Sequence, residues 1–155
     1  MVLLGKSLSG GFMPISCVLA DNEIMDNIKP GDHGSTFGGN PLAGVIGIEA
    51  LNVVVDENLI ENSRKMGKIL LKSLQEIAAS KDFVKAVRGK GLFCVAEILN
   101  DEKNDALKVT MKLMEKGLLA KPTHDNIIRL CPPLVINEKQ LRESIAIIKE
   151  VFDSF

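Results

Sequence analysis

Lys6 is the first residue whose type and position could do chemistry. It follows the apolar run Val2-Leu3-Leu4 and Gly5, and a segment rich in serine and glycine comes after it. An amine at the end of a buried strand can project into a cleft and form a Schiff base with a carbonyl cofactor. A solvated lysine fits the same position, because most lysines are exposed.

The tripeptide Gly5-Lys6-Ser7 also imitates the end of a phosphate-binding P-loop. That motif needs a glycine five positions before Gly5, outside this chain. The sequence therefore does not predict a nucleotide-binding loop here.

A second candidate is the glycine-rich segment of residues 31–39, which carries the hydroxyls of Ser35 and Thr36. It lies directly before Asn40 and Pro41, a good N-cap and first residue for a helix. Backbone N–H groups and the helix dipole favour an anion at such a place, so a bound phosphate is one interpretation. A capped helix entry with a permissive turn is the other.

Arg129 is the third candidate, because it lies in the aliphatic run Ile127-Ile128-Arg129-Leu130. A guanidinium near apolar surface requires a carboxylate to offset its lost hydration. A substrate carboxylate would serve, and so would a structural Asp or Glu.

No metal site or disulfide framework is predicted. Cys17, Cys94 and Cys131 are far apart and embedded among apolar residues, as reduced core thiols are. His33 and His124 each lack a second ligand at helical spacing.

Charge and hydropathy exclude several classes of partner. A formal net charge of -1 does not indicate the excess positive charge that is typical of proteins that bind nucleic acid or an anionic membrane. No apolar run approaches the roughly 20 residues of a membrane span, and Lys6, the Gly10-Gly11 pair and Pro14 interrupt any signal-peptide core. We expect small-molecule substrates, no nucleic acid and no membrane.

Apolar periodicity predicts the elements around the first two candidates. Residues 2–4 are expected to end a buried strand of a parallel sheet, and residues 15–20 to form a second strand. A short helix is predicted from residue 21 or 22 to about 28, and a longer one from Asn40. The apolar stripe of the longer helix is expected to consist of Leu42, Val45, Ile46, Ala50 and Val53.

The rest of the chain alternates between short strands and amphipathic helices. Helices are predicted at residues 59–79, 105–116 and 138–152, and strands at 84–87, 92–98, 118–121 and 127–130. The apolar side of the first of these helices is expected to consist of Ile60, Ser63, Met66, Gly67, Leu70, Leu74 and Ile77. The predicted fold is therefore α/β, with residues 1–56 as the tail of one α/β layer and residues 57–155 as an α+β domain.

Taken in order, these segments resemble the class III aminotransferases of fold type I, the ornithine aminotransferase group most closely. Residues 3–11 resemble the family's segment around the Schiff-base lysine, and residues 31–42 its phosphate loop, which crosses the dimer. Residues 87–92 and 127–136 are similar to signatures of its small domain. The resemblance runs from Val2 to Phe155.

This resemblance implies pyridoxal 5'-phosphate as cofactor and a role for each candidate. Lys6 would hold the cofactor and act as general base and acid. Thr36 would bind the phosphate of the cofactor held by the other subunit of a homodimer, with Ser35 beside it near the substrate. Arg129 would receive a substrate carboxylate. Residues 1–56 would then belong to the large cofactor-binding domain, and residues 57–155 would form the small domain.

The implied reaction transfers the δ-amino group of ornithine to 2-oxoglutarate, giving glutamate 5-semialdehyde and glutamate. Acetylornithine aminotransferase is the near alternative. A decarboxylase or aminomutase of the same fold type, and a non-catalytic interaction module derived from an aminotransferase, are the others.

No segment of this chain can supply the family's Asp at the pyridine nitrogen or the aromatic ring stacked on the cofactor. Preceding chain is therefore expected, and this chain alone is expected to be inactive. The predicted location is the cytoplasm, or the mitochondrial matrix if a transit peptide precedes residue 1.

Overall fold

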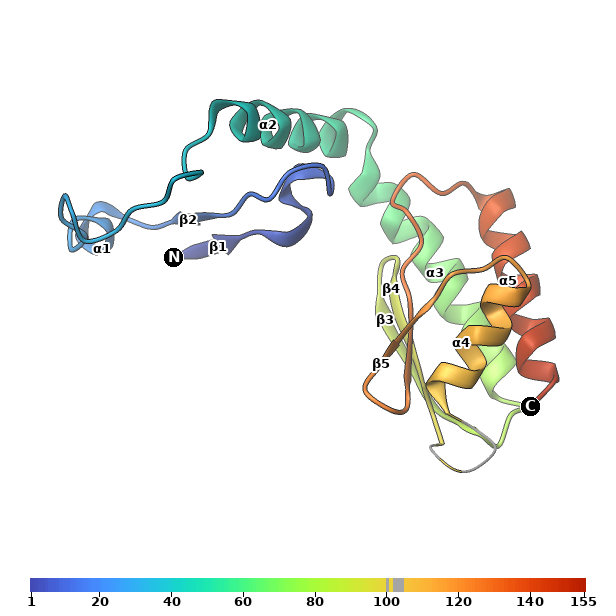
Figure 1. Cartoon of the computed structure of the whole chain (residues 1–155). Helices are drawn as coiled ribbons and strands as arrows, with labels where there is room; N and C mark the ends of the chain where they lie inside the picture. The colour runs from blue at the N-terminus through green and yellow to red at the C-terminus, as the bar shows by residue number, and fades with distance from the viewer. Residues whose placement is uncertain (100, 102–104) are drawn as a thin grey trace. The chain divides into compact units, whose positions relative to one another are not determined.

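The computed structural model describes residues 1–99, 101 and 105–155, and the chain forms two compact units, Met1–Asn58 and Leu59–Phe155 (Figure 1). Both contain helices and strands, which confirms the predicted mixed α/β class. No helix among the described residues is long and apolar enough to cross a membrane.

The first unit is a two-stranded sheet, a loop-rich segment and a helix. Its elements are β1 (Val2–Leu4), the 3-10 helix η1 (Lys6–Ser9), β2 (Cys17–Leu19), α1 (Asn22–Met25) and α2 (Pro41–Asp56). The strands pair antiparallel, with Val2 opposite Leu19. A parallel pair needs a crossover, usually a helix, and residues 5–16 between these strands contain only the single turn of η1.

The two strands are present where the sequence predicted them, but the expected burial of β1 is wrong for this chain. Leu3 is 69% exposed, and Val2 and Leu4 are exposed as well. The reason is that β1 has β2 as its only strand neighbour among the described residues. Its apolar side chains therefore depend on covering layers that residues 1–58 do not supply.

The α2 helix begins as predicted but packs through a different face. The Asn40 side chain accepts hydrogen bonds from the backbone N–H groups of Leu42 (2.9 Å) and Ala43 (3.3 Å). The buried positions are Ala43 and Gly47, one turn apart, whereas Leu42 and Val45 of the predicted stripe are exposed. Small residues occupy the buried face of α2 because the loop before β2 lies close against it. A Cβ on Gly47 would come within 3.2 Å of Ile15 Cδ1.

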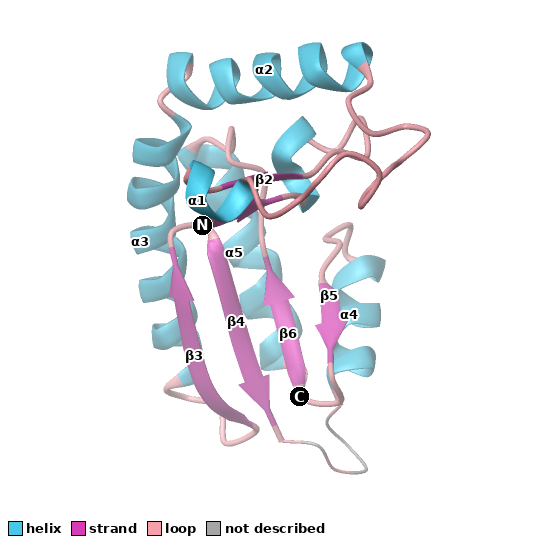
Figure 2. Ribbon diagram, turned by 90° about the vertical axis from the view of Figure 1, so that its left-hand side faces the viewer, coloured by secondary structure: helices cyan, strands magenta, loops and turns pink. Residues whose placement is uncertain are grey.

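The second unit is a four-stranded antiparallel sheet with three helices. Its elements are α3 (Leu59–Ala78), β3 (Val84–Lys90), β4 (Phe93–Ile98), α4 (Ala106–Glu115), β5 (Lys121–Thr123), β6 (Ile127–Leu130) and α5 (Glu138–Asp153). The strand order is β3-β4-β6-β5. Figure 2 shows the helices gathered on one face of the sheet. Among the residues that the structure describes, no helix of this unit covers the other face.

The core of this unit lies between the sheet and its helices. Cys94, Ala96 and Ile98 alternate along β4 on the covered face, and all three are fully buried. From β6, Ile128 and Leu130 join them, and α3, α4 and α5 contribute one apolar stripe each. The intervening strand residues therefore project from the open face.

Most predicted elements of this unit are confirmed, with three differences. The first is that β3 continues to Lys90, although its strand was predicted to end at Val87. Ile60 is 74% exposed, because the buried stripe of α3 is in phase with Leu59 rather than with Ile60. The strand expected at residues 118–121 is instead β5, at Lys121–Thr123, because Leu118 is still tied to α4 by a hydrogen bond from its N–H to the Leu113 carbonyl. The last helix has the predicted cap, since Asn137 and Gln140 form a reciprocal capping box.

Candidate active site

Lys6 lies where β1 ends and η1 begins, with its side chain exposed. Its φ is 56°, a left-handed conformation that non-glycine residues rarely adopt. Such backbone strain persists only when the surroundings impose it, and it gathers at functional sites. The chain thus holds Lys6 in an unfavourable backbone conformation, which changes the direction of the chain after β1.

Ser9 fixes the loop that carries Lys6. Its side chain is 1% exposed, and its hydroxyl donates to the Met13 carbonyl (2.5 Å) and accepts from the Met13 N–H (3.0 Å). Gly10, with φ 65°, ends η1. Because both hydrogen bonds close the same short loop, the segment after Lys6 has a defined shape despite its serine and glycine content.

Lys6 and Ser35 line one open pocket of about 700 Å³. Between them the lining includes Gly38, Gly39 and Asn40 from the loop that leads into α2. An amine, a hydroxyl and the start of a long helix therefore surround one space in the first unit. Such a set suits an anionic carbonyl compound, because the amine can attack the carbonyl while N–H and O–H donors face the anion.

The loop of residues 31–39 is ordered by its own hydrogen bonds. Ser35 Oγ accepts from the Gly38 N–H at 3.0 Å, which makes a tight turn directly before the cap of α2. A Cβ on Gly38 would lie 2.9 Å from the Ser35 Cβ, so this turn requires glycine. The capped helix entry predicted from the sequence is therefore confirmed, and the segment also presents the Ser35 hydroxyl to a pocket.

Thr36, next to Ser35, is exposed and does not belong to the lining of the Lys6 pocket. Consecutive residues of this turn thus face different surroundings.

Arg129 belongs to the second unit and lies on the open face of the sheet. It lines a pocket of about 400 Å³ together with Arg88, Phe93 and Thr123. Its guanidinium carbon lies 6.0 Å from the centre of the Phe93 ring, at the outer limit of a cation–π contact. Within the described residues no carboxylate forms an ion pair with Arg129, so the structural Asp or Glu considered from sequence is not found there.

Sequence reasoning missed the residues around Arg129. Phe93, Thr123 and Lys121 share its face of the sheet. The signal was available, because residues that alternate with buried positions along adjacent strands meet on the open face. The register between the strands could not be read from the sequence, and that register brings them together.

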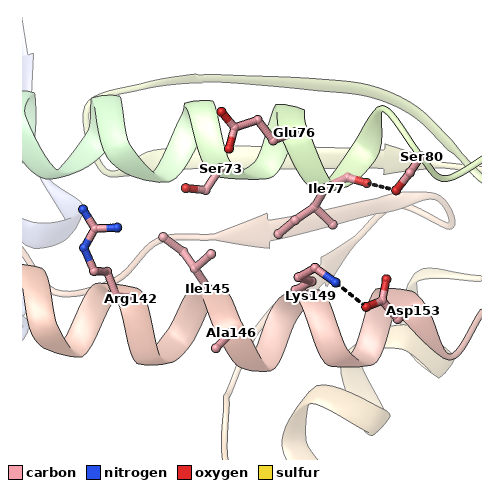
Figure 3. A pocket seen from close by; sticks show the side chains of 9 residues that line it. All are labelled: Ser73, Glu76, Ile77, Ser80, Arg142, Ile145, Ala146, Lys149 and Asp153. Atoms are coloured by element: carbon pink, nitrogen blue, oxygen red, sulfur yellow. Dashed lines mark hydrogen bonds and ion pairs between the residues drawn. The ribbon is translucent and has the colours of Figure 1, made fainter.

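A third pocket, of about 350 Å³, lies between α3 and α5 (Figure 3). Its charged side chains are already engaged: Lys149 pairs with Asp153 at 2.6 Å and Arg142 with Glu138 at 2.6 Å. Exposed pairs of this kind stabilise a helix surface weakly. With its charges neutralised in this way, the pocket offers a ligand no unpaired cation.

The thiols do not form a site either. Cys94 is buried, and burial raises its pKa to about 11, so it stays protonated at neutral pH. In the described part of the chain no group of three or more His, Cys, Asp or Glu residues could hold a metal ion.

Comparison with known proteins gives a consistent set of relatives. The family described as "Aminotransferase class-III" matches residues 1–152. The mitochondrial ornithine aminotransferase of Rattus norvegicus is 55% identical over the whole of this chain, which spans 35% of that relative. The ornithine aminotransferase of Plasmodium yoelii yoelii is 49% identical over the whole chain and 37% of its own length.

Solved structures agree with these relatives. Ornithine delta-aminotransferase from Plasmodium falciparum superposes with a TM-score of 0.94 at 46% identity, over 99% of this chain and 39% of that one. Acetylornithine aminotransferase from Elizabethkingia anophelis superposes with a TM-score of 0.92 at 50% identity, over 99% of this chain and 38% of that one. The chain spans about a third of the length of the curated relatives that it matches.

Proposed function

The chain belongs to the class III aminotransferase family, and we propose that it is the carboxy-terminal part of a pyridoxal 5'-phosphate enzyme. The full-length enzyme transfers the δ-amino group of ornithine to 2-oxoglutarate, giving glutamate 5-semialdehyde and glutamate. The observation that carries the proposal is the pocket in which the strained Lys6 and Ser35 meet.

The residues of that pocket fit the cofactor by their chemistry. Lys6 supplies an amine for the cofactor's aldehyde, and Ser35 supplies a hydroxyl beside the substrate. The cofactor, when bound, supplies the electron sink that lets a carbon–hydrogen bond next to the amino group break. No other residue of the lining carries an amine side chain.

Lys6 has two tasks in this proposal. Its Nζ holds the cofactor before substrate enters, and afterwards it moves a proton. As a base, Nζ would remove the proton from the substrate carbon that bears the amino group; as an acid, it would deliver a proton to the cofactor carbon that carried the aldehyde, and not back to that substrate carbon. The fixed shape of the loop after Lys6 keeps the amine within reach for both tasks.

Thr36 binds the cofactor phosphate of the other subunit, so the enzyme works as a homodimer with active sites shared across the interface. Its exposure, and its position outside the Lys6 pocket of its own chain, support this assignment. Hydroxyl and backbone N–H donors are suited to a phosphate, and the loop of residues 31–39 offers both.

Arg129 binds a substrate carboxylate. Its guanidinium lines a pocket and lacks an ion pair among the described residues, so its charge is available to a ligand. A planar guanidinium, with two parallel N–H donors, matches the geometry of a carboxylate better than an ammonium does.

In domain terms, residues 1–56 are the end of the large cofactor-binding domain and residues 57–155 the small domain. The two compact units support this division, although they meet two residues later, at Asn58 and Leu59. The Asp for the pyridine nitrogen and the stacking ring come from the rest of the full-length enzyme, so this chain alone is inactive. The cytoplasm is the proposed location, and the mitochondrial matrix is the alternative, since the rat relative is named as mitochondrial.

The experiment is an amino-transfer assay of the full-length enzyme with 2-oxoglutarate and either ornithine or N-acetylornithine. We expect a higher kcat/KM with ornithine. The outcome that reverses the assignment is faster transfer from N-acetylornithine, a second candidate that the acetylornithine aminotransferase structure at 50% identity favours. Loss of carbon dioxide or migration of the amino group, without formation of glutamate, would point instead to a decarboxylase or an aminomutase.

A further inference from the structure

The hydroxyl of Thr123 is an unexplained polar group of the second unit. Its Oγ1 is buried and has no hydrogen-bond partner among the described residues. Leaving a buried hydroxyl unpaired costs about 1–3 kcal/mol. The same side chain lines the pocket of Arg129, so the unpaired donor lies beside a guanidinium that has no ion pair in the described part of the chain.

Strand register puts these two groups on one face of the sheet. Lys121 is opposite Arg129, and Thr123 is opposite Ile127. Directly opposed residues project from the same face, and so do residues two apart along a strand. Thr123 and Arg129 therefore both project from the open face, whereas Ile128 is buried on the covered face.

Among the described residues, the open face carries unpaired positive charge, which favours binding of an anion. Like charges directly opposite each other destabilise a sheet, and Lys121 opposite Arg129 is such a pair. Glu97, an acid on the same face, is engaged by Arg88 at 2.8 Å. Neither Lys121 nor Arg129 has an ion-pair partner within the described part of the chain, so a bound anion would relieve their repulsion.

We propose that Thr123 is a substrate-binding residue whose hydroxyl donates a hydrogen bond to the carboxylate held by Arg129. Rotation about the Cα–Cβ bond of Thr123 turns the hydroxyl toward the pocket that its side chain already lines. The hydrogen bond satisfies the unpaired donor, and the guanidinium binds the same carboxylate. This assignment rests on the proposed function, because that function supplies the carboxylate.

The charge of the face selects between the two substrates. At neutral pH 2-oxoglutarate is a dianion, whereas ornithine, with two ammonium groups and one carboxylate, is a cation. Lys121 and Arg129 attract the dianion and repel the cation. Thr123 thus contributes to recognition of the 2-oxo acid and not of ornithine.

Glutarate is the probe for this site, since it carries both carboxylates but no carbonyl that could react. Its Kd is measured by calorimetry on the full-length, cofactor-loaded enzyme and on variants. Thr123→Val removes the hydroxyl at nearly constant shape, and we expect it to weaken glutarate binding about tenfold, as loss of a hydrogen bond to a charged group does. Thr123→Ser keeps the hydroxyl and should bind glutarate nearly as the parent does.

Thr110→Val is the matched control. Its hydroxyl is also buried, in α4, where it donates to the Leu107 carbonyl at 3.0 Å, and Thr110 does not line the pocket of Arg129. Glutarate binding should not change in this variant. If Thr123→Val also impairs folding, Thr123→Ala provides a second hydroxyl-free variant, and circular dichroism identifies the folded ones.

Two results overturn the inference: an unchanged Kd for glutarate in Thr123→Val and Thr123→Ala, or an equal loss in Thr110→Val. Kinetics separate this failure from failure of the proposed function. If the parent transfers amino groups but the KM for 2-oxoglutarate is the same in Thr123→Val, only the role of Thr123 is wrong. If the parent binds glutarate through Thr123 but transfers no amino group, the site stands and the proposed reaction falls.

Discussion

Gly67 in α3 lies directly against the backbone of Gly91, in the turn between β3 and β4. A Cβ added to Gly67 would come within 2.2 Å of the carbonyl carbon and oxygen of Gly91. The Gly91 turn itself has φ 56° and sits against the Ser63 hydroxyl, which accepts the N–H of Leu92 at 3.1 Å. The α3 helix and the β3–β4 turn are thus joined by glycine contacts that allow no side chain.

Replacing Gly67 with alanine should therefore destabilise the full-length enzyme by about 3 kcal/mol, since neither backbone can yield without moving a packed element. Gly44 is the control. It also lies inside a helix, but nothing lies within 4 Å of an added Cβ, so Gly44→Ala should raise stability by about 0.5–1 kcal/mol. Denaturant midpoints measure both, and equal effects would contradict the contact.

Lys6→Ala should abolish covalent trapping of the cofactor by borohydride in the full-length enzyme. Amino transfer should fall by about 10²–10⁴-fold, because the variant loses its proton-transfer group. Lys29→Ala removes another exposed lysine of the first unit and should keep both properties. Mass spectrometry of the reduced protein locates the label, and a label elsewhere in the Lys6→Ala variant would exclude Lys6.

Mixed dimers test whether Thr36 acts across the interface. If Lys6 and Thr36 of different subunits form each site, a dimer of one Lys6→Ala chain and one Thr36→Val chain contains one intact site. Random reassembly makes half of the dimers mixed, so about a quarter of the parent activity should return. If Thr36 serves its own subunit, mixing restores nothing above the average of the two variants.

Arg129→Lys should raise the KM for 2-oxoglutarate about 10–100-fold while kcat with saturating 2-oxoglutarate changes little, because lysine keeps the charge and loses the planar fork. Arg64→Lys is the control, since Arg64 is exposed and pairs with Glu61 on the surface of α3. Steady-state kinetics at varied 2-oxoglutarate concentration measure the KM and kcat of both variants. A fall in kcat alone would assign Arg129 to a different step.

The buried Cys94 should make stability depend on alkaline pH. Burial raises its pKa in the folded state from 9.0 to about 11, so above pH 9 the unfolded chain loses a proton that the folded chain keeps. The stabilisation from Cys94 is therefore complete below pH 9 and lost between pH 9 and about 11, with an upper limit of roughly 3 kcal/mol. Denaturant midpoints across this range should fall less steeply for Cys94→Ala, and parallel curves would refute the assignment.

Features that depend only on residues close together in the chain could be predicted from the sequence. Asn40 and Asn137 predicted helix starts because a side-chain oxygen can accept the free N–H groups of the first turn, and both do so in the structure. The strand of Ile127–Leu130 was also predicted with its bounds. Lys6, Ser35 and Arg129 were found from their neighbours in the chain, and each lines a pocket.

Tertiary structure decided what depends on residues far apart in the chain. The face of α2 that packs is set by Ile15 against Gly47, and the phase of α3 by its contact with the β3–β4 turn at Gly91. Pairing of β5 with β6 brought Thr123 and Lys121 to the face of Arg129. A helix cap depends only on the residues of its own turn. Packing and strand register depend on how well surfaces from distant segments fit together, and the sequence of one segment alone does not specify that fit.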